Sequence, residues 1–163
     1  MFDNLGVGAG PSPLGSPGSG SLVMFPAESF ETALLDLTVP NLGVEIVPAK
    51  PGYISVPNTA VWLIEQAQGN QTVPLSVQLG SDPAHVNWLA SVSTFPTAAQ
   101  FNACVGITPC EPGGVGFAGG AALALPHPPN TPIFMDVTAG AQGTGPMIFK
   151  ARLVIWVFWV AGG

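Results

Sequence analysis

The C-terminal segment "MIFKARLVIWVFWV", Met147 to Val160, constrains the fold of this chain more than any other feature. Eight apolar residues follow one another from Leu153 to Val160. A helix that spans a membrane needs about 20 apolar residues, so this run is too short, and we expect no membrane partner. A β-strand that is buried on both faces fits the length. One face would pack on the core of the domain, and a second sheet or another subunit would cover the other.

The two faces of this strand differ along their length. The odd positions, which begin at Met147, are apolar throughout, whereas the even positions include Lys150 and Arg152 before they become apolar at Val154. Because side chains alternate between the faces of a strand, the odd face is predicted to be core from end to end. The even face is predicted to be exposed to solvent at the start of the strand and to contact a neighbouring chain from Val154 onward. The interface residues predicted on this face are Arg152, Trp156, Phe158 and Val160.

The composition favours a protein that is packed against other proteins. Charged residues make up 7% of the chain, against about 25% in typical globular proteins. Hydrophobic residues make up 47%, which is enough to form a core. So little charge does little to keep an isolated protein in solution, and it suits a surface that is covered in an assembly.

The charge balance excludes two classes of partner. The net charge is −6, and the basic residues are Lys50, Lys150 and Arg152. Three basic residues cannot build the basic face that direct nucleic-acid binding or a membrane-surface helix requires. The first four residues carry no positive region and no apolar core, so no signal peptide is expected.

The chain divides into an arm and one domain. Residues 1–22 contain six glycines, three prolines and four serines without an apolar period, which predicts an arm that is extended or flexible by itself. The arm could be a disordered tail, or it could become ordered on a neighbouring subunit, with Phe2 and Leu5 as interface residues. Residues 23–163 are predicted to form a single β-sandwich domain.

Most of this domain shows the period of two that is typical of strands. Seven or eight short strands separated by Gly/Pro turns predict an all-β fold, either an antiparallel β-sandwich or a jelly-roll-like barrel. Pro74 suggests an edge strand, residues 68–71 suggest a turn, and Thr97 is a plausible N-cap for a short helix. Residues 108–120 suggest a loop. The predicted strands are residues 33–39, 42–47, 53–56, 60–65, 73–79, 85–92, 132–138 and 147–160.

Two cysteines, Cys104 and Cys110, leave three alternatives open. They could be small buried or turn residues, they could form a short-loop disulfide, or they could bind a metal ion together with His85 and His127. A structural zinc site needs four ligands, and the spacing of the histidines does not indicate one. We therefore predict no metal ion.

No pattern in the chain predicts catalysis. The glycine pattern "GVGFAG" at residues 114–119 does not lie between a strand and a helix, as a dinucleotide site requires, so no cofactor is expected. His85 and His127 do not lie near a nucleophile motif, and we expect surface or interface histidines. Asp36 and Glu45 could meet as a carboxylate pair on adjacent strands, but solvated strand faces are the simpler interpretation. We expect a protein that is not an enzyme.

The C-terminal segment "NTPIFMDVTAGAQGTGPMIFKARLVIWVFWV" resembles the closing hairpin of small all-β virion proteins of tailed bacteriophages. In those proteins a "TPIYLDVTTAATGT"-like strand and turn lead into a long Val-rich final strand. The resemblance covers about 30 residues. It implies a head-decoration, cement or other accessory virion role, and it brings no catalytic residues with it.

Two functions of different classes follow. The first is a structural virion protein that decorates or cements the capsid surface of a phage, as a homo-oligomer, with a trimer expected, bound to the major capsid protein. The second is a fibre, spike or lectin-like module that binds host glycan. In that case an exposed aromatic ring such as Tyr53, Trp62 or Trp88 would stack on a sugar.

Overall fold

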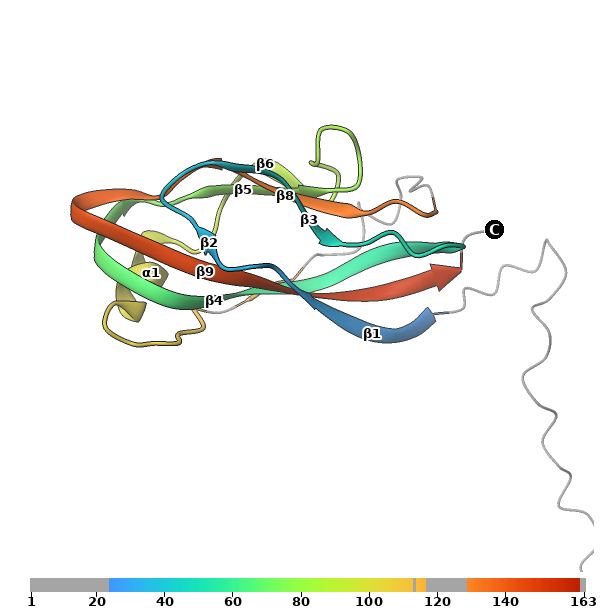
Figure 1. The fold of residues 1–163 in the computed structure, drawn as a ribbon, viewed down its shortest axis with the longest axis horizontal. Coiled ribbons are helices and arrows are strands. Elements are labelled where there is room, and N and C mark those ends of the chain that lie inside the picture. The colour runs from blue at the N-terminus through green and yellow to red at the C-terminus, as the bar shows by residue number, and fades with distance from the viewer. Residues whose placement is uncertain (1–23, 113, 117–128, 162–163) are drawn as a thin grey trace, which may run out of the picture.

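The protein is an antiparallel β-sandwich, as predicted from the strand pattern (Figure 1). The computed structural model describes residues 24–112, 114–116 and 129–161. The predicted arm, residues 1–22, lies outside the described residues. Two sheets face each other, and every strand pair is antiparallel.

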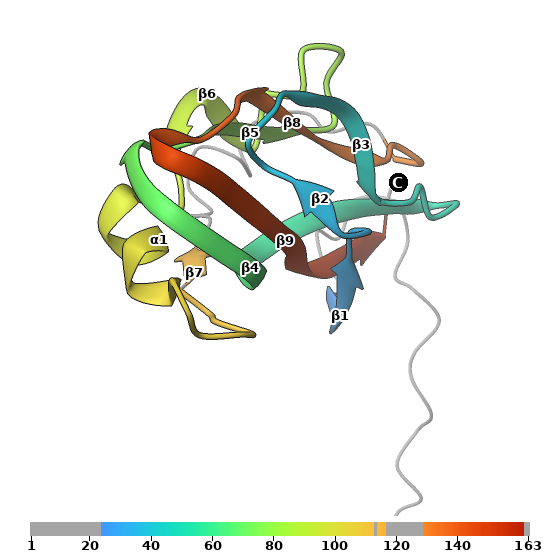
Figure 2. The same ribbon diagram turned by 60° about the vertical axis from the view of Figure 1, so that its left-hand side comes forward.

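Sheet A has the order β1-β9-β4-β7, with β2 also paired to β9, and sheet B has the order β3-β8-β5-β6. The strands of sheet A are β1 (Met24–Glu31), β2 (Leu35–Asp36), β4 (Tyr53–Val73), β7 (Gly114–Gly116) and β9 (Gln142–Ala161). The strands of sheet B are β3 (Asn41–Val47), β5 (Ser76–Gly80), β6 (Leu89–Thr94) and β8 (Ile133–Ala139). The helix α1 (Ala98–Cys104) lies beside β4 and β7 (Figure 2).

Strands β4 and β9 form a two-stranded ribbon that runs the length of the sandwich. They have 21 and 20 residues and pair from Tyr53 opposite Ala161 to Val73 opposite Gln142. The predicted strands 53–56 and 60–65 are therefore one strand. A bulge beyond Pro57, which has no backbone N–H to donate, lets the pairing continue.

The predicted turn at residues 68–71 is wrong. Asn70 pairs with Thr144 and Gln71 pairs with Gly143, so β4 continues through this polar segment. Gly69 adopts a φ of +95°, which a residue with a side chain rarely adopts, and it lies at the register shift between Gln68 and Asn70. The glycine therefore bends the strand without ending it.

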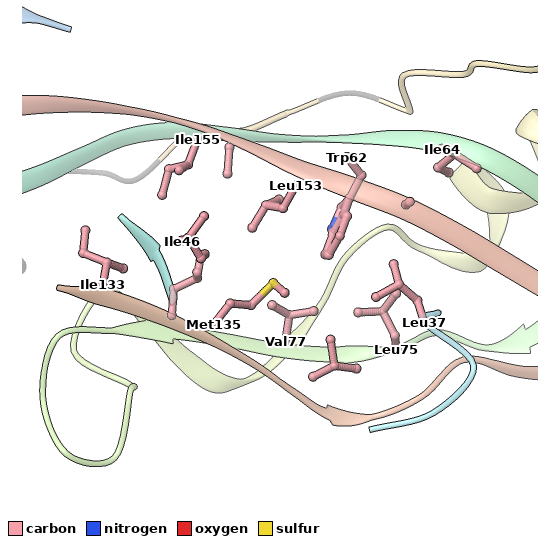
Figure 3. Close-up of a cluster of buried hydrophobic side chains, with 14 of the residues drawn as sticks. Leu37, Ile46, Trp62, Ile64, Leu75, Val77, Ile133, Met135, Leu153 and Ile155 are labelled. Carbon is pink, nitrogen blue, oxygen red and sulfur yellow. The ribbon is translucent and has the colours of Figure 1, made fainter. Parts of the chain in front are cut away.

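The core fills the space between the inner faces of the two sheets. Figure 3 shows Trp62, Leu153 and Ile155 of sheet A pointing toward Met135 and Val77 of sheet B. All five are at most 3% exposed. The odd face of β9 is core from Phe149 to Trp159, as predicted, whereas Met147, predicted to be core as well, is half-buried against it. Its six buried residues, each at most 2% exposed, are Phe149, Ala151, Leu153, Ile155, Val157 and Trp159.

The connection between β8 and β9 is an arch between the sheets. The sequence resemblance predicts that these two strands form a hairpin, but β8 pairs with β3 and β5 of sheet B, whereas β9 pairs within sheet A. Both strands turn their odd positions toward the core, which facing strands of opposite sheets can do. The arch packs tightly, because a Cβ on Gly140 would collide with the backbone carbonyl of Thr38.

Three other sequence predictions differ from the structure: the edge strand at Pro74, the strand at residues 85–92 and the loop over residues 108–120. β5 lies between β8 and β6, so it is not an edge strand. Pro74 is compatible with this position because it precedes the strand and removes no hydrogen bond from it. The predicted strand 85–92 begins only at Leu89, because residues 81–88 form a loop in which His85 has a positive φ. Asp36 and Glu45 lie in different sheets and are both exposed, which agrees with the interpretation that they belong to solvated strand faces and do not form a carboxylate pair. The short strand β7 lies within the predicted loop 108–120.

Helix α1 begins as predicted, at the N-cap Thr97. The Thr97 hydroxyl accepts from the backbone N–H of Gln100, and the Gln100 side chain accepts from the backbone N–H of Thr97, a capping box. Phe101 is buried against Phe149, with ring centroids 4.7 Å apart. The helix therefore closes the end of the core around which β4 and β9 bend.

Cys104 and Cys110 form a disulfide, which decides among the three alternatives. Their Cα atoms are 5.5 Å apart. Cys110 also exchanges two backbone hydrogen bonds with Ile64 of β4, at 2.8 and 2.9 Å. The segment that follows α1 is thus fastened both to the helix and to the central ribbon.

A buried carboxylate, Asp136 of β8, binds both the loop 81–88 and the neighbouring strand β3. It accepts hydrogen bonds from the backbone N–H of Gly43 and, at 2.9 Å, from the side chain of Gln78, and it lies 3.0 Å from Nδ1 of His85. Burial by itself raises the pKa of Asp136. The hydrogen bonds from Gly43, Gln78 and His85 together outweigh burial and hold this pKa below its ordinary value.

We expect Asp136→Asn to lower the free energy of unfolding at neutral pH by about 1–3 kcal/mol, because an amide nitrogen cannot accept the hydrogen bonds of the carboxylate. The pKa of Asp136 is lower in the folded than in the unfolded state, so its contribution is fully present above about pH 3.9 and is lost as the pH falls through the folded value. Urea unfolding of the wild type and of the Asp136→Asn variant between pH 7 and pH 3 measures the difference between their free energies of unfolding. A difference that stays constant down to pH 3 would contradict it.

Reduction of the disulfide is expected to lower the free energy of unfolding by about 2 kcal/mol, as loop entropy gives for a separation of six residues. Urea unfolding with and without a thiol reductant measures the change without altering the volume of any side chain. The Cys104→Ala/Cys110→Ala variant is the control and should not respond to the reductant. Equal stability of the oxidised and reduced wild type would contradict the expectation.

Candidate interaction surface

The side of sheet A that faces away from the core is apolar where the C-terminal part of β9, Val154 to Val160, pairs with the first part of β4. Its side chains are the even positions of β9 and the positions of β4 that lie opposite them. The register pairs Val160 with Ile54, Phe158 with Val56 and Val154 with Val61. We call this surface the outer face, and we define it by Ile54, Val56, Val61, Leu63, Val154, Trp156, Phe158 and Val160.

All eight side chains of the outer face are half-buried. Each is flanked by neighbours in its own and the adjacent strand, which cover its sides and leave part of it accessible. The contrast is sharp along β9, where every residue from Phe149 to Trp159 alternates between buried and half-buried. From Val154 to Val160 both faces of this strand are apolar, but only the outer side chains remain partly accessible to solvent.

Each face of β9 carries a tryptophan side chain. Trp159 is 2% exposed and lies in the core, where its ring meets Phe30 edge-on at 6.1 Å. Trp156, three residues earlier, lies on the outer face beside Phe158. Large aromatic side chains at the centre of an accessible apolar surface are typical anchors of protein interfaces.

A cluster of charged side chains borders the outer face at the end nearer to α1. Arg152 lies on the same side of β9 as Val154, and its guanidinium is 2.9 Å from Glu31 and 3.2 Å from Glu65. These ion pairs are partly exposed, so they contribute little to stability. They bridge β1, β9 and β4 across the sheet and hold the arginine in place.

Two of the three basic side chains are thus paired within the chain. Arg152 is shared between Glu31 and Glu65, and Lys50 lies 2.9 Å from Glu28 and 4.7 Å above the ring of Trp159. Lys50 precedes β4 and Glu28 lies in β1, so this contact joins the two at the end of sheet A away from the Arg152 cluster. Little positive charge is left for an acidic partner.

The structure brings four predicted interface residues onto one surface. Arg152, Trp156, Phe158 and Val160 all lie on the same side of β9. Phe2 and Leu5 lie outside the described residues. The contribution of β4 was not predicted, although residues 60–65, "AVWLIE", carry a signal for it, because their apolar residues fall on both faces of the strand.

The residues considered for catalysis or ligand binding lie elsewhere. His85 is half-buried, stacked on Phe134 at 4.7 Å and bound to Asp136, so it supports the fold of its loop. His127 and residues 117–119 of the glycine pattern lie outside the described residues. In the part of the chain that is described, no three His, Cys, Asp or Glu side chains gather where they could hold a metal ion.

Two of the three aromatic residues considered for sugar stacking are core residues. Trp62 is fully buried and donates from its indole nitrogen to the carbonyl oxygen of Phe95, and Trp88 is 8% exposed. Tyr53 is half-buried and packs against the core cluster. The structure therefore leaves neither Trp62 nor Trp88 as a platform for a sugar ring.

Among the described residues, no helix is both long enough and apolar enough to cross a membrane.

Comparisons with known proteins give one distant structural likeness. No family model matches the chain, and no curated protein matches it significantly. The fold is similar to a chain of the structure "Cyanophage Pam1 capsid asymmetric unit", with 12% identity, a TM-score of 0.42 and 99% of each chain covered. A likeness of this degree carries no argument about function.

The outer face is expected to contribute much less to the stability of the single chain than the inner face. Trp159→Ala should lower the free energy of unfolding by about 3–5 kcal/mol, as large-to-small changes in cores do, and Trp156→Ala by no more than about half of that. Chemical unfolding of the two variants in dilute protein compares them directly, since both replace a tryptophan of β9. Equal losses would show that the outer face belongs to the core.

Proposed function

We propose that this protein is a non-enzymatic structural component of a phage particle, which decorates or cements the capsid shell through apolar contacts of the outer face. It would act as a homo-oligomer, with three copies expected, and would bind the major capsid protein at the capsid surface. The observation that carries the proposal is the second apolar face of β9 and β4. This face is accessible and has aromatic side chains at its centre.

The chemistry of the outer face supports a permanent contact. Apolar burial contributes about 25 cal/mol per Å², and a stable protein interface buries about 1,600 Å² in total. Trp156 and Phe158 would supply the large anchors of such an interface. The charged border of Arg152, Glu31 and Glu65 would lie at its rim, where charged residues set orientation more than affinity.

The composition and the sequence resemblance point to a virion. A chain with 7% charged residues and a net charge of −6 has few groups that keep an exposed apolar face in solution, so an assembled state suits it. The C-terminal resemblance, residues 130–160, implies a virion accessory role and includes β8 and β9. The outer face thus belongs in part to the segment that carries the resemblance.

The decisive variant is Trp156→Asp, which places a charge at the centre of the outer face. We expect it to abolish both oligomerisation and attachment to particles, because an unpaired charge cannot be buried in an apolar contact without a large cost. Light scattering measures the first and co-sedimentation with particles that lack the protein measures the second. Circular dichroism checks that the variant is folded.

The matched control is Leu42→Asp, since Leu42 lies in β3 of sheet B and is 70% exposed. This variant should oligomerise and attach as the wild type does. If Trp156→Asp is folded and retains both properties, the outer face is not the contact surface and the proposal fails. Mass spectrometry of purified particles then places the protein: hundreds of copies mean the shell, and a handful mean a vertex or the tail.

A further inference from the structure

We infer that residues 1–22 of one copy bind across the outer face of a second copy. This inference rests on the proposed function, because it names the occupant of the same surface.

The arm joins the sheet at the apolar end of the outer face. β1 runs antiparallel to β9, with Glu31 opposite Val154 and Met24 opposite Val160. The chain that precedes Met24 is therefore attached next to the row formed by Val160 and Ile54, at the end opposite to the Arg152 cluster. The position of Met24 thus brings the arm to the apolar part of the surface.

The direction of β1 favours a second copy over the same chain. Followed backwards from Glu31 to Met24, β1 runs toward the end of the sheet and not back over its face. To cover its own outer face, the arm would have to reverse its direction immediately before Met24. An adjacent copy at that end of the sheet would receive the arm without any reversal.

The arm is long enough for this role. An extended chain covers about 3.3 Å per residue, so 22 residues reach about 70 Å. The apolar part of β9, from Val154 to Val160, is about 20 Å long on the same scale. About a third of the arm would suffice to cross it, and the remainder can span the distance between two copies.

The chemistry of the arm matches that of the surface. Its single charged residue is Asp3, and the apolar rows of the outer face carry no charge, so the contact would bury no unpaired charge along most of its length. Proline-rich segments are extended at little entropic cost and dock on aromatic side chains. Pro11, Pro13 and Pro17 are suited to the rings of Trp156 and Phe158.

Photo-crosslinking in the full-length protein tests the inference. A benzophenone amino acid replaces Phe158, and the isolated protein is prepared as an equal mixture of ¹⁵N-labelled and unlabelled chains. After irradiation, mass spectrometry identifies the linked peptides. We expect links from position 158 to residues 1–22, with about half of them joining a labelled to an unlabelled chain. Links to residues 1–22 only within one chain overturn the inference, and so does the absence of any link to them.

Substitutions in the arm provide the second measurement. The Phe2→Ser/Leu5→Ser variant should weaken self-association by at least about tenfold, the equivalent of about 1.4 kcal/mol, because it removes two apolar anchors. The Ser12→Ala/Ser16→Ala variant is the control and should associate as the wild type does. Unchanged association of the first variant in sedimentation experiments overturns the inference.

The two proposals fail in different ways. If Trp156→Asp still abolishes attachment to particles but position 158 links to another segment or to the capsid protein, the proposed function stands and the arm is not the occupant. If Trp156→Asp changes neither association nor attachment, both fail.

Discussion

The pairing of β4 with β9 is the interaction on which the rest of the structure depends. These strands have 21 and 20 residues and stay paired through four irregularities of register. β1 and β2 join the free edge of β9, and β7, the disulfide-bonded segment and α1 are attached along β4. Without this ribbon, sheet A would have no common partner for its short strands.

The ribbon serves two surfaces at once because its apolar residues occupy both of its faces. The inner face meets sheet B and is closed to solvent, and Trp62 and Trp159 lie in it. The outer face has similar side chains, among them Trp156, but they are only half-buried. Because these side chains keep part of their surface accessible in the folded chain, a partner could contact them without any change of the fold.

Polar and covalent contacts add to the stabilisation that the ribbon provides. Asp136 accepts hydrogen bonds from β3, from β5 and from the loop 81–88, so one carboxylate joins two strands of sheet B and a loop. The Cys104–Cys110 disulfide does the same for the segment after α1. Arg152 bridges three strands at the border of the outer face. Several of the few charged residues in this chain therefore join neighbouring segments of the fold.

Local signals in the sequence predicted the features that depend on neighbouring residues. The alternation from Phe149 to Trp159 identified the core face of β9, and Thr97 identified the start of α1. The turn expected at residues 68–71 did not form, because pairing with β9 outweighs the turn preference of Gly69 and Asn70. His85 was expected in a strand, but the distant Asp136 holds its loop in another conformation.

By itself, the sequence determined the class of the fold and the two-sided apolar character of the last strand, because alternation and turn residues act within a few positions along the chain. Only the tertiary structure decided which strands pair, that β8 and β9 belong to opposite sheets, and that β4 completes the outer face. These features depend on contacts between residues far apart in the chain, and no local pattern encodes which partner such a residue will meet.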